Sequence, residues 1–170
     1  MILIVMGVSG SGKTTLAHAL VKLTGWQFAE GDDYHSAANK AKMHAKQALT
    51  DEDRAPWLAT LHALIVNWHE RGESGILTCS ALKQAYRDTL AAGLPEDACH
   101  FVLTDAPKEV IAERMQARQD HFMPEELLDS QIATLEMPKN ALRVSALQAP
   151  EVAAREVLTA LGIKPVLERN

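Results

Sequence analysis

The sequence predicts an α/β fold of three layers, in which helices cover both faces of a five-stranded parallel sheet. Short apolar runs alternate with longer helical stretches, which is typical of that class. The first run, Ile2–Met6, is apolar and rich in β-branched side chains, as a strand buried on both faces should be. A glycine-rich turn at residues 7–12 follows it directly and leads into a helix expected at 15–23. Right-handed crossovers would then place the helices on both faces of the sheet.

The remaining elements follow in the same alternation along the chain. Further strands are expected at residues 27–30, 75–79, 100–104 and 142–145. Helices are expected at residues 82–90, 107–118, 125–135 and 151–161, and a long helix is expected to begin near Asp53. Apolar residues form one stripe on the long helix, and we expect that stripe to pack in the core: Trp57, Leu61, Leu64, Ile65 and Trp68.

Size and composition limit what the chain can be. With 170 residues and 47% hydrophobic content, one domain spanning residues 1–170 is expected. A formal net charge of −5 argues against general binding of nucleic acid. Cys79 and Cys99 are too few for a disulfide framework or a zinc site. We find no secretory signal and no apolar run long enough to span a membrane, so we expect a cytoplasmic protein without a membrane partner.

The glycine-rich turn carries a phosphate-binding motif. It reads Gly7-Val8-Ser9-Gly10-Ser11-Gly12-Lys13-Thr14, which fits the pattern G-x-x-x-x-G-K-[ST]. Between a strand and a helix, the backbone N–H groups and the positive helix end converge on one point. We expect Lys13 to reach the β- and γ-phosphates and the Thr14 hydroxyl to hold Mg²⁺, with Thr15 completing the nucleotide-binding segment. The motif therefore predicts binding of a nucleoside triphosphate.

An acidic residue follows the second predicted strand. Ligands of open α/β sheets bind at the carboxyl ends of the strands, which is where Asp32 falls. If the second strand neighbours the first, Asp32 lies beside the phosphate loop. A carboxylate there can accept the proton of an attacking hydroxyl and can order Mg²⁺ through water. The alternative is that Asp32 caps the helix that follows.

Four basic residues are harder to explain as solvated surface. Lys42 and Arg54 stand in a segment of mixed charge, and an acceptor that is an acid needs such a partner. Arg114 and Arg118 share one helix face, where like charges repel mildly. We expect this pair to belong to a lid at about residues 115–126 that closes over the triphosphate. Arg118 is then catalytic, together with Lys13 and Asp32, although an exposed surface pair remains the alternative.

Two longer motifs resemble those of a known family. They are Asp51-x-Asp53-Arg54-x-Pro56-Trp57 and Cys79-Ser80-Ala81-Leu82-Lys83-x-x-Tyr86-Arg87-Asp88. With Arg114-x-x-x-Arg118 and His121-Phe122-Met123-Pro124, they resemble the bacterial-type gluconate kinases, which are P-loop proteins similar to nucleoside-monophosphate kinases. The resemblance covers most of the chain as far as about Glu136. It implies a five-stranded parallel sheet with a mobile lid, a homodimer, and the use of ATP and Mg²⁺.

The resemblance also implies a reaction and a set of residues. The reaction transfers a phosphoryl group from ATP to the 6-hydroxyl of D-gluconate, giving 6-phospho-D-gluconate and ADP. Asp32 is implied as the base on that hydroxyl. The residues implied for the substrate pocket are His35, Lys42, Arg54, Ser80, Lys83 and Arg87, with His121 and Gln131 at the edge of the lid. Arg114 and Arg118 are implied as the lid arginines.

The chain departs from the family pattern in several places. Ser36 replaces a common proline, and Lys46 and Ala48 replace the glycine and proline of a turn on the acceptor side. Residues 137–149, where the family contacts adenine, form a shorter segment than usual.

Two alternative functions are considered. A shikimate-kinase-like enzyme is disfavoured because Cys79-Ser80-Ala81-Leu82 replaces its triple-glycine turn, and a non-catalytic ATP-binding sensor is disfavoured by the retained Lys13, Thr14 and Asp32.

Overall fold

The computed structural model describes residues 1–118 and 125–166 of the chain. Five strands form one sheet in the order β2-β3-β1-β4-β5, and every pairing between neighbours is parallel. The strands are β1 (Ile2–Met6), β2 (Gln27–Glu30), β3 (Gly75–Thr78), β4 (Cys99–Asp105) and β5 (Leu142–Ser145). The predicted five-stranded parallel sheet is therefore confirmed. The supposed adjacency of the first two strands is wrong, because β3 pairs with both β1 and β2 and separates them.

The helices match the prediction with one addition. They are α1 (Lys13–Thr24), α2 (Ala37–His44), α3 (Asp51–Glu70), α4 (Gln84–Ala91), α5 (Lys108–Ala117), α6 (Glu125–Thr134) and α7 (Pro150–Ala160), with a 3-10 turn, η1, at Gly31–Tyr34. The helix α2 was not predicted, because Asn39 is its one buried residue and it shows no apolar stripe. No helix within residues 1–118 and 125–166 is long and apolar enough to cross a membrane.

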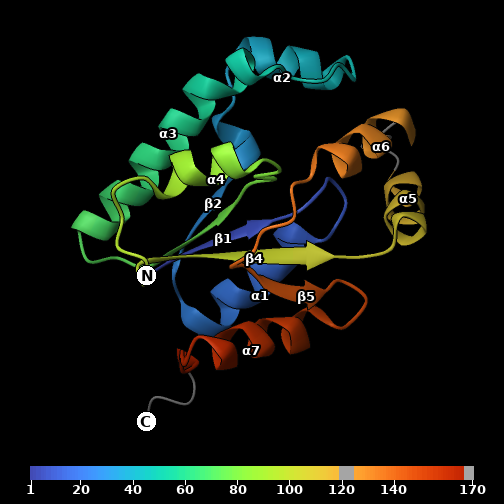
Figure 1. Cartoon of the computed structure of the whole chain (residues 1–170). Coiled ribbons are helices and arrows are strands. Elements are labelled where there is room, and N and C mark those ends of the chain that lie inside the picture. The colour runs from blue at the N-terminus through green and yellow to red at the C-terminus, as the bar shows by residue number, and fades with distance from the viewer. Residues whose placement is uncertain (119–124, 167–170) are drawn as a thin grey trace.

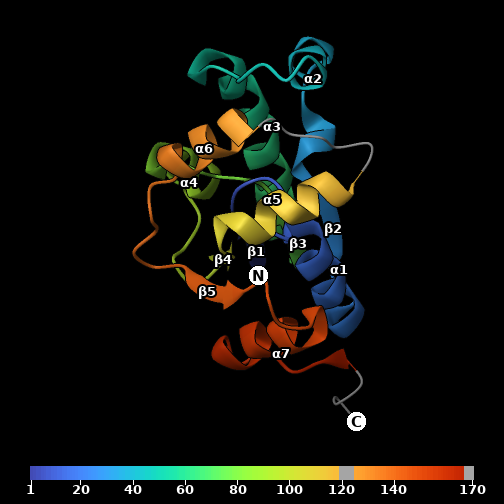
Figure 2. The ribbon, with the colours of Figure 1, turned by 90° about the vertical axis from the view of Figure 1, so that its right-hand side faces the viewer.

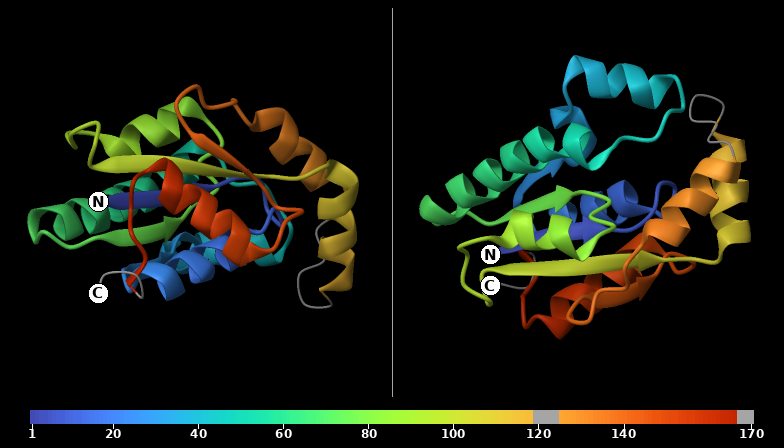
Figure 3. Two further views of the ribbon diagram at one scale, coloured as in Figure 1. Left: turned by 90° about the horizontal axis from the view of Figure 1, so that it is seen from below. Right: turned by 45° about the horizontal axis from the view of Figure 1, so that its top comes forward.

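Two cores cover the two faces of the sheet. Because side chains alternate along a strand, Ile2, Ile4 and Met6 pack with α3 and α4, while Leu3 and Val5 pack with α1 and α7. Figures 1 and 2 show α3 and α4 on one side of the sheet and α1 and α7 on the other, and the left panel of Figure 3 shows the α1–α7 layer from below. The predicted stripe of α3 is confirmed as core, with Leu64 partly buried and the other four residues buried.

A third, smaller core lies at the carboxyl ends of β1 and β4. There Val8 of the phosphate loop packs with Leu82, Ile111, Met115 and Leu128. The right panel of Figure 3 shows α5 and α6 side by side at this end of the sheet. The packing is close, since a Cβ added to Gly10 would lie 2.5 Å from the sulfur of Met115. The phosphate loop is therefore held from outside by α5 and α6.

Candidate active site

The phosphate loop links β1 to α1 and owes its shape to its glycines. Gly7 has a φ of 141°, and a Cβ there would lie 2.7 Å from Ser11 Oγ and 2.9 Å from the carbonyl oxygen of Thr104. The hydroxyls of Ser11 and Thr104 are hydrogen-bonded at 2.7 Å in this buried corner. Gly12, with a φ of 93°, is the N-cap of α1, so no side chain caps the helix and its first N–H groups face the loop.

Lys13 reaches back across the loop. Its Nζ donates to the carbonyl oxygens of Gly7 and Val8, at 3.0 Å each. Burial lowers the pKa of Lys13, while the charges of Asp32, Cys79 and Glu30 act in the opposite direction, with Asp32 the largest of the three. The two carboxylates therefore lie close enough to the ammonium group to interact with it, although β2 and β1 are not neighbours.

Glu30, the last residue of β2, has a place in the site that sequence reasoning missed. Its Oε2 accepts a 2.7 Å hydrogen bond from the Thr14 hydroxyl, and its Oε1 accepts one of 2.5 Å from Thr78. A hydroxyl and a carboxylate are oxygen ligands of the kind that Mg²⁺ takes directly or through water. The residues present therefore fit a magnesium site at Thr14, with Glu30 rather than Asp32 against the threonine.

Asp32 lies in the 3-10 turn η1 directly after β2. The turn starts close to β3, since a Cβ on Gly31 would lie 2.1 Å from the carbonyl oxygen of Thr78. The indole N–H of Trp57 donates to the Gly31 carbonyl at 2.8 Å and fixes the turn to α3. The Asp32 side chain is 60% exposed. It accepts no cap hydrogen bond from α2, whose N-cap is Ser36, so the helix-capping alternative is wrong.

His35 is buried behind Asp32. Its ring stacks on Trp57 with centroids 4.0 Å apart, and its Nε2 lies 3.9 Å from Asp32 Oδ1. The Asn39 side-chain nitrogen lies 3.3 Å from His35 Nδ1. Burial lowers the pKa of His35 to about 4, with smaller contributions from the charges of Arg54 and Lys40. The imidazole is therefore neutral around pH 7.

The acceptor-side cations gather around the start of α3. Lys42 pairs with Asp53 at 2.8 Å, which holds the pKa of that carboxyl at about 2. Lys83 pairs with Asp51 at 3.1 Å. The hydrogen bond from Tyr86, more than the one from Lys83, lowers the pKa of Asp51.

Arg54 lies in the same cluster. Its guanidinium donates to the Leu49 carbonyl at 2.6 Å and lies 5.5 Å from the ring centre of Tyr86. Ser80 belongs to the same edge of the sheet, where its carbonyl accepts from the Gly7 N–H at 3.2 Å. Two of the implied substrate residues, Arg54 and Lys83, are thus brought together at Tyr86, and Lys42 lies at the same end of α3 against Asp53.

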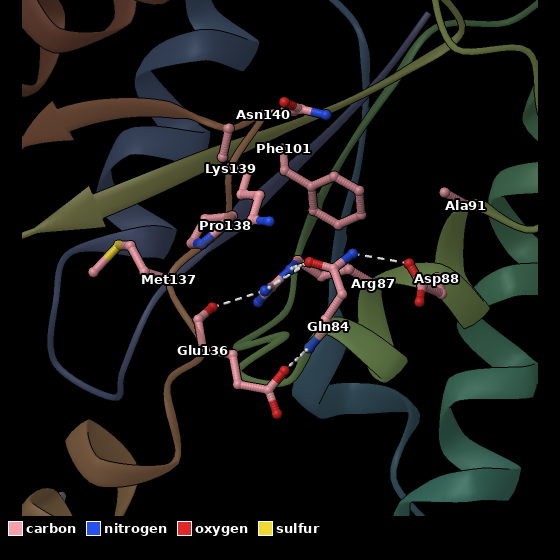
Figure 4. Close-up of a pocket in the computed structure, with 11 residues that line it drawn as sticks. Gln84, Arg87, Asp88, Ala91, Phe101, Glu136, Met137, Pro138, Lys139 and Asn140 are labelled. Carbon is pink, nitrogen blue, oxygen red and sulfur yellow. Dashed lines mark hydrogen bonds between the residues drawn. The ribbon is translucent and has the colours of Figure 1, made fainter.

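Arg87 has different surroundings from those that the resemblance implies. It is only 2% exposed, and its guanidinium donates to the carbonyls of Ala81, at 2.7 Å, and Glu136, also at 2.7 Å. The Gln84 side chain accepts two more bonds from it. Figure 4 shows Arg87 between Gln84 and the main chain of Glu136, at a cavity of about 450 Å³ that no residue of the phosphate loop lines. Because its donors are used on main-chain carbonyls, Arg87 joins two chain segments and does not face the phosphate loop.

Gln131 contacts the nucleotide side and not the acceptor side. It accepts from the Ser9 N–H at 2.8 Å and donates to Ser9 Oγ at 3.2 Å. Arg114 donates to the Ala146 carbonyl at 2.6 Å, close to Gly12. Arg118 is exposed at the end of α5. His121, and residues 119–124 of the predicted lid, lie outside the described residues.

Fold and site together define a P-loop kinase, with a triphosphate cradle and a carboxylate at the carboxyl edge of a parallel sheet. Residues 2–138 match the family described as an AAA domain. A gluconokinase of Gluconobacter oxydans is 47% identical over 160 residues, which is 92% of this chain and 88% of that protein. The chain belongs to the gluconokinase family.

Two solved structures agree with this assignment. A sugar kinase from Janibacter sp. HTCC2649 has a TM-score of 0.87 at 46% identity, and the match covers 99% of this chain and 98% of that chain. A gluconokinase from Sinorhizobium meliloti 1021 has a TM-score of 0.82 at 40% identity, and the match covers 94% of this chain and 90% of that chain. The similarity therefore extends over the whole sheet and the helices around it.

Proposed function

We propose that this chain transfers the γ-phosphoryl group of ATP to the 6-hydroxyl of D-gluconate, giving 6-phospho-D-gluconate and ADP. The observation that carries the proposal is the position of Asp32, directly after β2 at the same carboxyl edge of the sheet as the phosphate loop, in a chain of the gluconokinase family. The similarity to gluconokinases over 92% of the chain favours gluconate over shikimate as the acceptor.

Each residue has a distinct task in this reaction. Asp32 accepts the proton of the 6-hydroxyl as its oxygen attacks the terminal phosphorus. Lys13 and the amide groups of the loop stabilise the charge on the phosphoryl oxygens, and Arg114 and Arg118 add to that stabilisation from the lid side. Thr14, with Glu30 behind it, would hold magnesium, which would supply positive charge against the triphosphate.

The acceptor is a carboxylate, and the cluster of Lys42, Arg54 and Lys83 supplies charge to hold it. Arginine can donate two parallel N–H bonds to one carboxylate, which makes Arg54 the principal candidate. His35 and Ser80 complete the pocket on the side of Asp32. Held at its acid end, gluconate would extend its 6-hydroxyl toward Asp32. For Arg87 and Gln131 we replace the substrate role with a supporting one, because their polar groups bind protein atoms.

Three further properties belong to the proposal, and of these only the homodimer rests on the family resemblance. We infer that the whole chain of 170 residues acts as one domain, that it works in the cytoplasm, and that it forms a homodimer. We also infer that it binds neither nucleic acid nor membrane. The net charge of −5 supports the absence of nucleic-acid binding, since phosphate backbones require a basic surface.

The direct test is release of ADP from ATP in the presence of Mg²⁺ and a panel of sugar acids. We expect turnover with D-gluconate, none with shikimate, and none after chelation of Mg²⁺. Lys13→Ala should abolish turnover without unfolding the chain. A protein that binds ATP but turns over no acceptor in the panel would be a sensor, and that outcome would reject the proposal.

A further inference from the structure

Asn39 is a buried polar residue that the proposed reaction does not use. It is 5% exposed, on the first turn of the short helix α2. Its side-chain nitrogen donates to the carbonyl oxygen of Asp53 at 2.8 Å and lies 3.3 Å from His35 Nδ1. Its backbone N–H donates to Ser36 Oγ at 3.1 Å. The Asn39 side chain therefore bridges the turn that carries Asp32 and the start of α3.

These contacts determine which nitrogen of His35 carries a proton. The carbonyl oxygen of Asp53 can only accept, so the Asn39 atom facing it must be the amide nitrogen. The same nitrogen faces His35 Nδ1, and a donor there requires Nδ1 to be the unprotonated, accepting nitrogen. In the neutral ring the proton then lies on Nε2, which is the nitrogen 3.9 Å from Asp32 Oδ1.

The ring itself has little freedom to turn. His35 is 7% exposed and stacks on Trp57 with an interplanar angle of 17°. The Trp57 indole N–H is bound to Gly31, the residue before Asp32. The His35 backbone N–H donates to the Asp32 carbonyl at 3.3 Å. Both the ring that carries the N–H and the turn that carries the carboxylate are therefore fixed to the same tryptophan.

We propose that Asn39 is a positioning residue for phosphoryl transfer: it selects the Nε2–H tautomer of His35, whose N–H holds the Asp32 carboxylate toward the acceptor hydroxyl. This inference rests on the proposed function, in which Asp32 is the base. The distance of 3.9 Å exceeds a hydrogen bond, so the inference requires it to shorten when the acceptor binds, as catalytic hydrogen bonds commonly do. The low pKa of His35 supports the inference, because a neutral ring has a tautomer to select.

The first test reads the tautomer in the unmodified protein. Nitrogen-15 NMR of the imidazole rings distinguishes a protonated from an unprotonated ring nitrogen, and the signal of His35 is identified by its loss in His35→Gln. The chain has seven histidines, so the assignment is practicable. We expect Nδ1 of His35 to be unprotonated and Nε2 to carry the proton. Protonation on Nδ1 would overturn the inference, and this test does not depend on any variant of Asn39 folding.

The second test removes the selection. In Asn39→Asp a carboxylate replaces the donor that faces His35 Nδ1, so Nδ1 no longer has to be the unprotonated nitrogen. We expect kcat to fall about 10- to 100-fold with the KM for gluconate little changed, because the base is misplaced and the acceptor cations are not. Asn67→Asp, the same change at an exposed position of α3, is the matched control and should leave kcat unaltered.

A double variant separates positioning from simple disruption. In His35→Gln the side-chain amide keeps an N–H for Asp32 without any tautomer, so Asn39→Asp should cost much less in that background than in the unmodified protein. Equal losses in both backgrounds would contradict the inference. Asp32→Asn separates a failure of the proposed base, Asp32, from a failure of the positioning role of Asn39. If it retains kcat, the proposed base is wrong; if it loses kcat while Asn39→Asp does not, only the role of Asn39 is wrong.

Discussion

Gln131 and Ser9, 122 residues apart in the chain, are joined by two hydrogen bonds. The Ser9 N–H donates to Gln131 Oε1 at 2.8 Å, and Gln131 Nε2 donates to Ser9 Oγ at 3.2 Å. Together with the contact of Leu128 and Val8, these bonds tie α6 to the phosphate loop. The loop is therefore shaped partly by a helix that follows the predicted lid.

Gln131→Met should weaken ATP binding and leave gluconate binding intact. Two hydrogen bonds contribute about 1–2 kcal/mol to the ordered loop, so we expect the KM for ATP to rise about 5- to 30-fold. Gln27→Met, at an exposed position on the opposite end of the sheet, is the matched control. Steady-state kinetics with each substrate varied in turn provide the measurement. A rise in the KM for gluconate alone would restore the substrate role of Gln131.

Arg87→Met should destabilise the fold more than it impairs catalysis. The substitution leaves the buried carbonyl of Ala81 and the partly buried carbonyl of Glu136 without this donor, which costs about 3 kcal/mol in the free energy of unfolding. Urea denaturation measures this loss. Arg71→Met, at a side chain 62% exposed, should cost less than about 1 kcal/mol. If Arg87→Met keeps full stability and loses gluconate binding, the substrate assignment of Arg87 is the correct one.

His35 should make the fold sensitive to mild acid. Its pKa is about 4 in the folded chain against 6.5 when unfolded, so the unfolded state binds a proton first as the pH falls. Stability is complete above pH 6.5 and declines between about pH 6.5 and 4, by up to about 3 kcal/mol. Denaturation at a series of pH values should show this slope in the unmodified protein and in His44→Gln, which replaces an exposed histidine of α2. In His35→Gln the slope should be much reduced; an unchanged slope would assign it to other groups.

Lys46 occupies a position that favours glycine. Its φ is 58°, and the N–H groups of Lys46 and Gln47 donate to the carbonyls of Met43 and Lys42, which is the Schellman pattern at the end of α2. Lys46→Gly should raise the free energy of unfolding by about 1 kcal/mol, because glycine adopts this conformation without strain. Lys40→Gly, within the same helix, should lower it by about 1 kcal/mol. Chemical denaturation measures the free energy of unfolding of both variants. A lower value for Lys46→Gly would show that interactions of the lysine side chain stabilise the fold by more than the backbone strain destabilises it.

The parts of the fold that the sequence predicts best are those encoded locally. The strand β1 is recognisable because it is buried on both faces, and residues 7–14 because their spacing serves one ligand. The order of the strands is not local, since no feature of residues 27–30 indicates that β3 inserts beside β1. The helix α2 cannot be predicted from an apolar pattern because it buries a single residue, Asn39.

The site is predictable to the extent that its residues follow strands. Asp32 is found by its position after β2, whereas Glu30 is missed because it is the last residue of the strand and its partner, Thr14, lies on α1. Arg87 has the right residue type and motif for a substrate contact. Its partners are main-chain carbonyls that folding brings near. Every residue has such a carbonyl, so the sequence does not indicate which ones Arg87 binds.

Activation of the 6-hydroxyl by Asp32 is tested by comparing Asp32→Asn with the unmodified protein in ATP- and gluconate-dependent release of ADP. Asparagine keeps the size of the side chain and cannot accept the proton of the 6-hydroxyl. We expect kcat to fall about 10²- to 10⁴-fold, with ATP affinity and thermal stability unchanged. Turnover within a fewfold of the unmodified rate would contradict it, because the carboxylate beside Lys13 would then have no part in activating the acceptor.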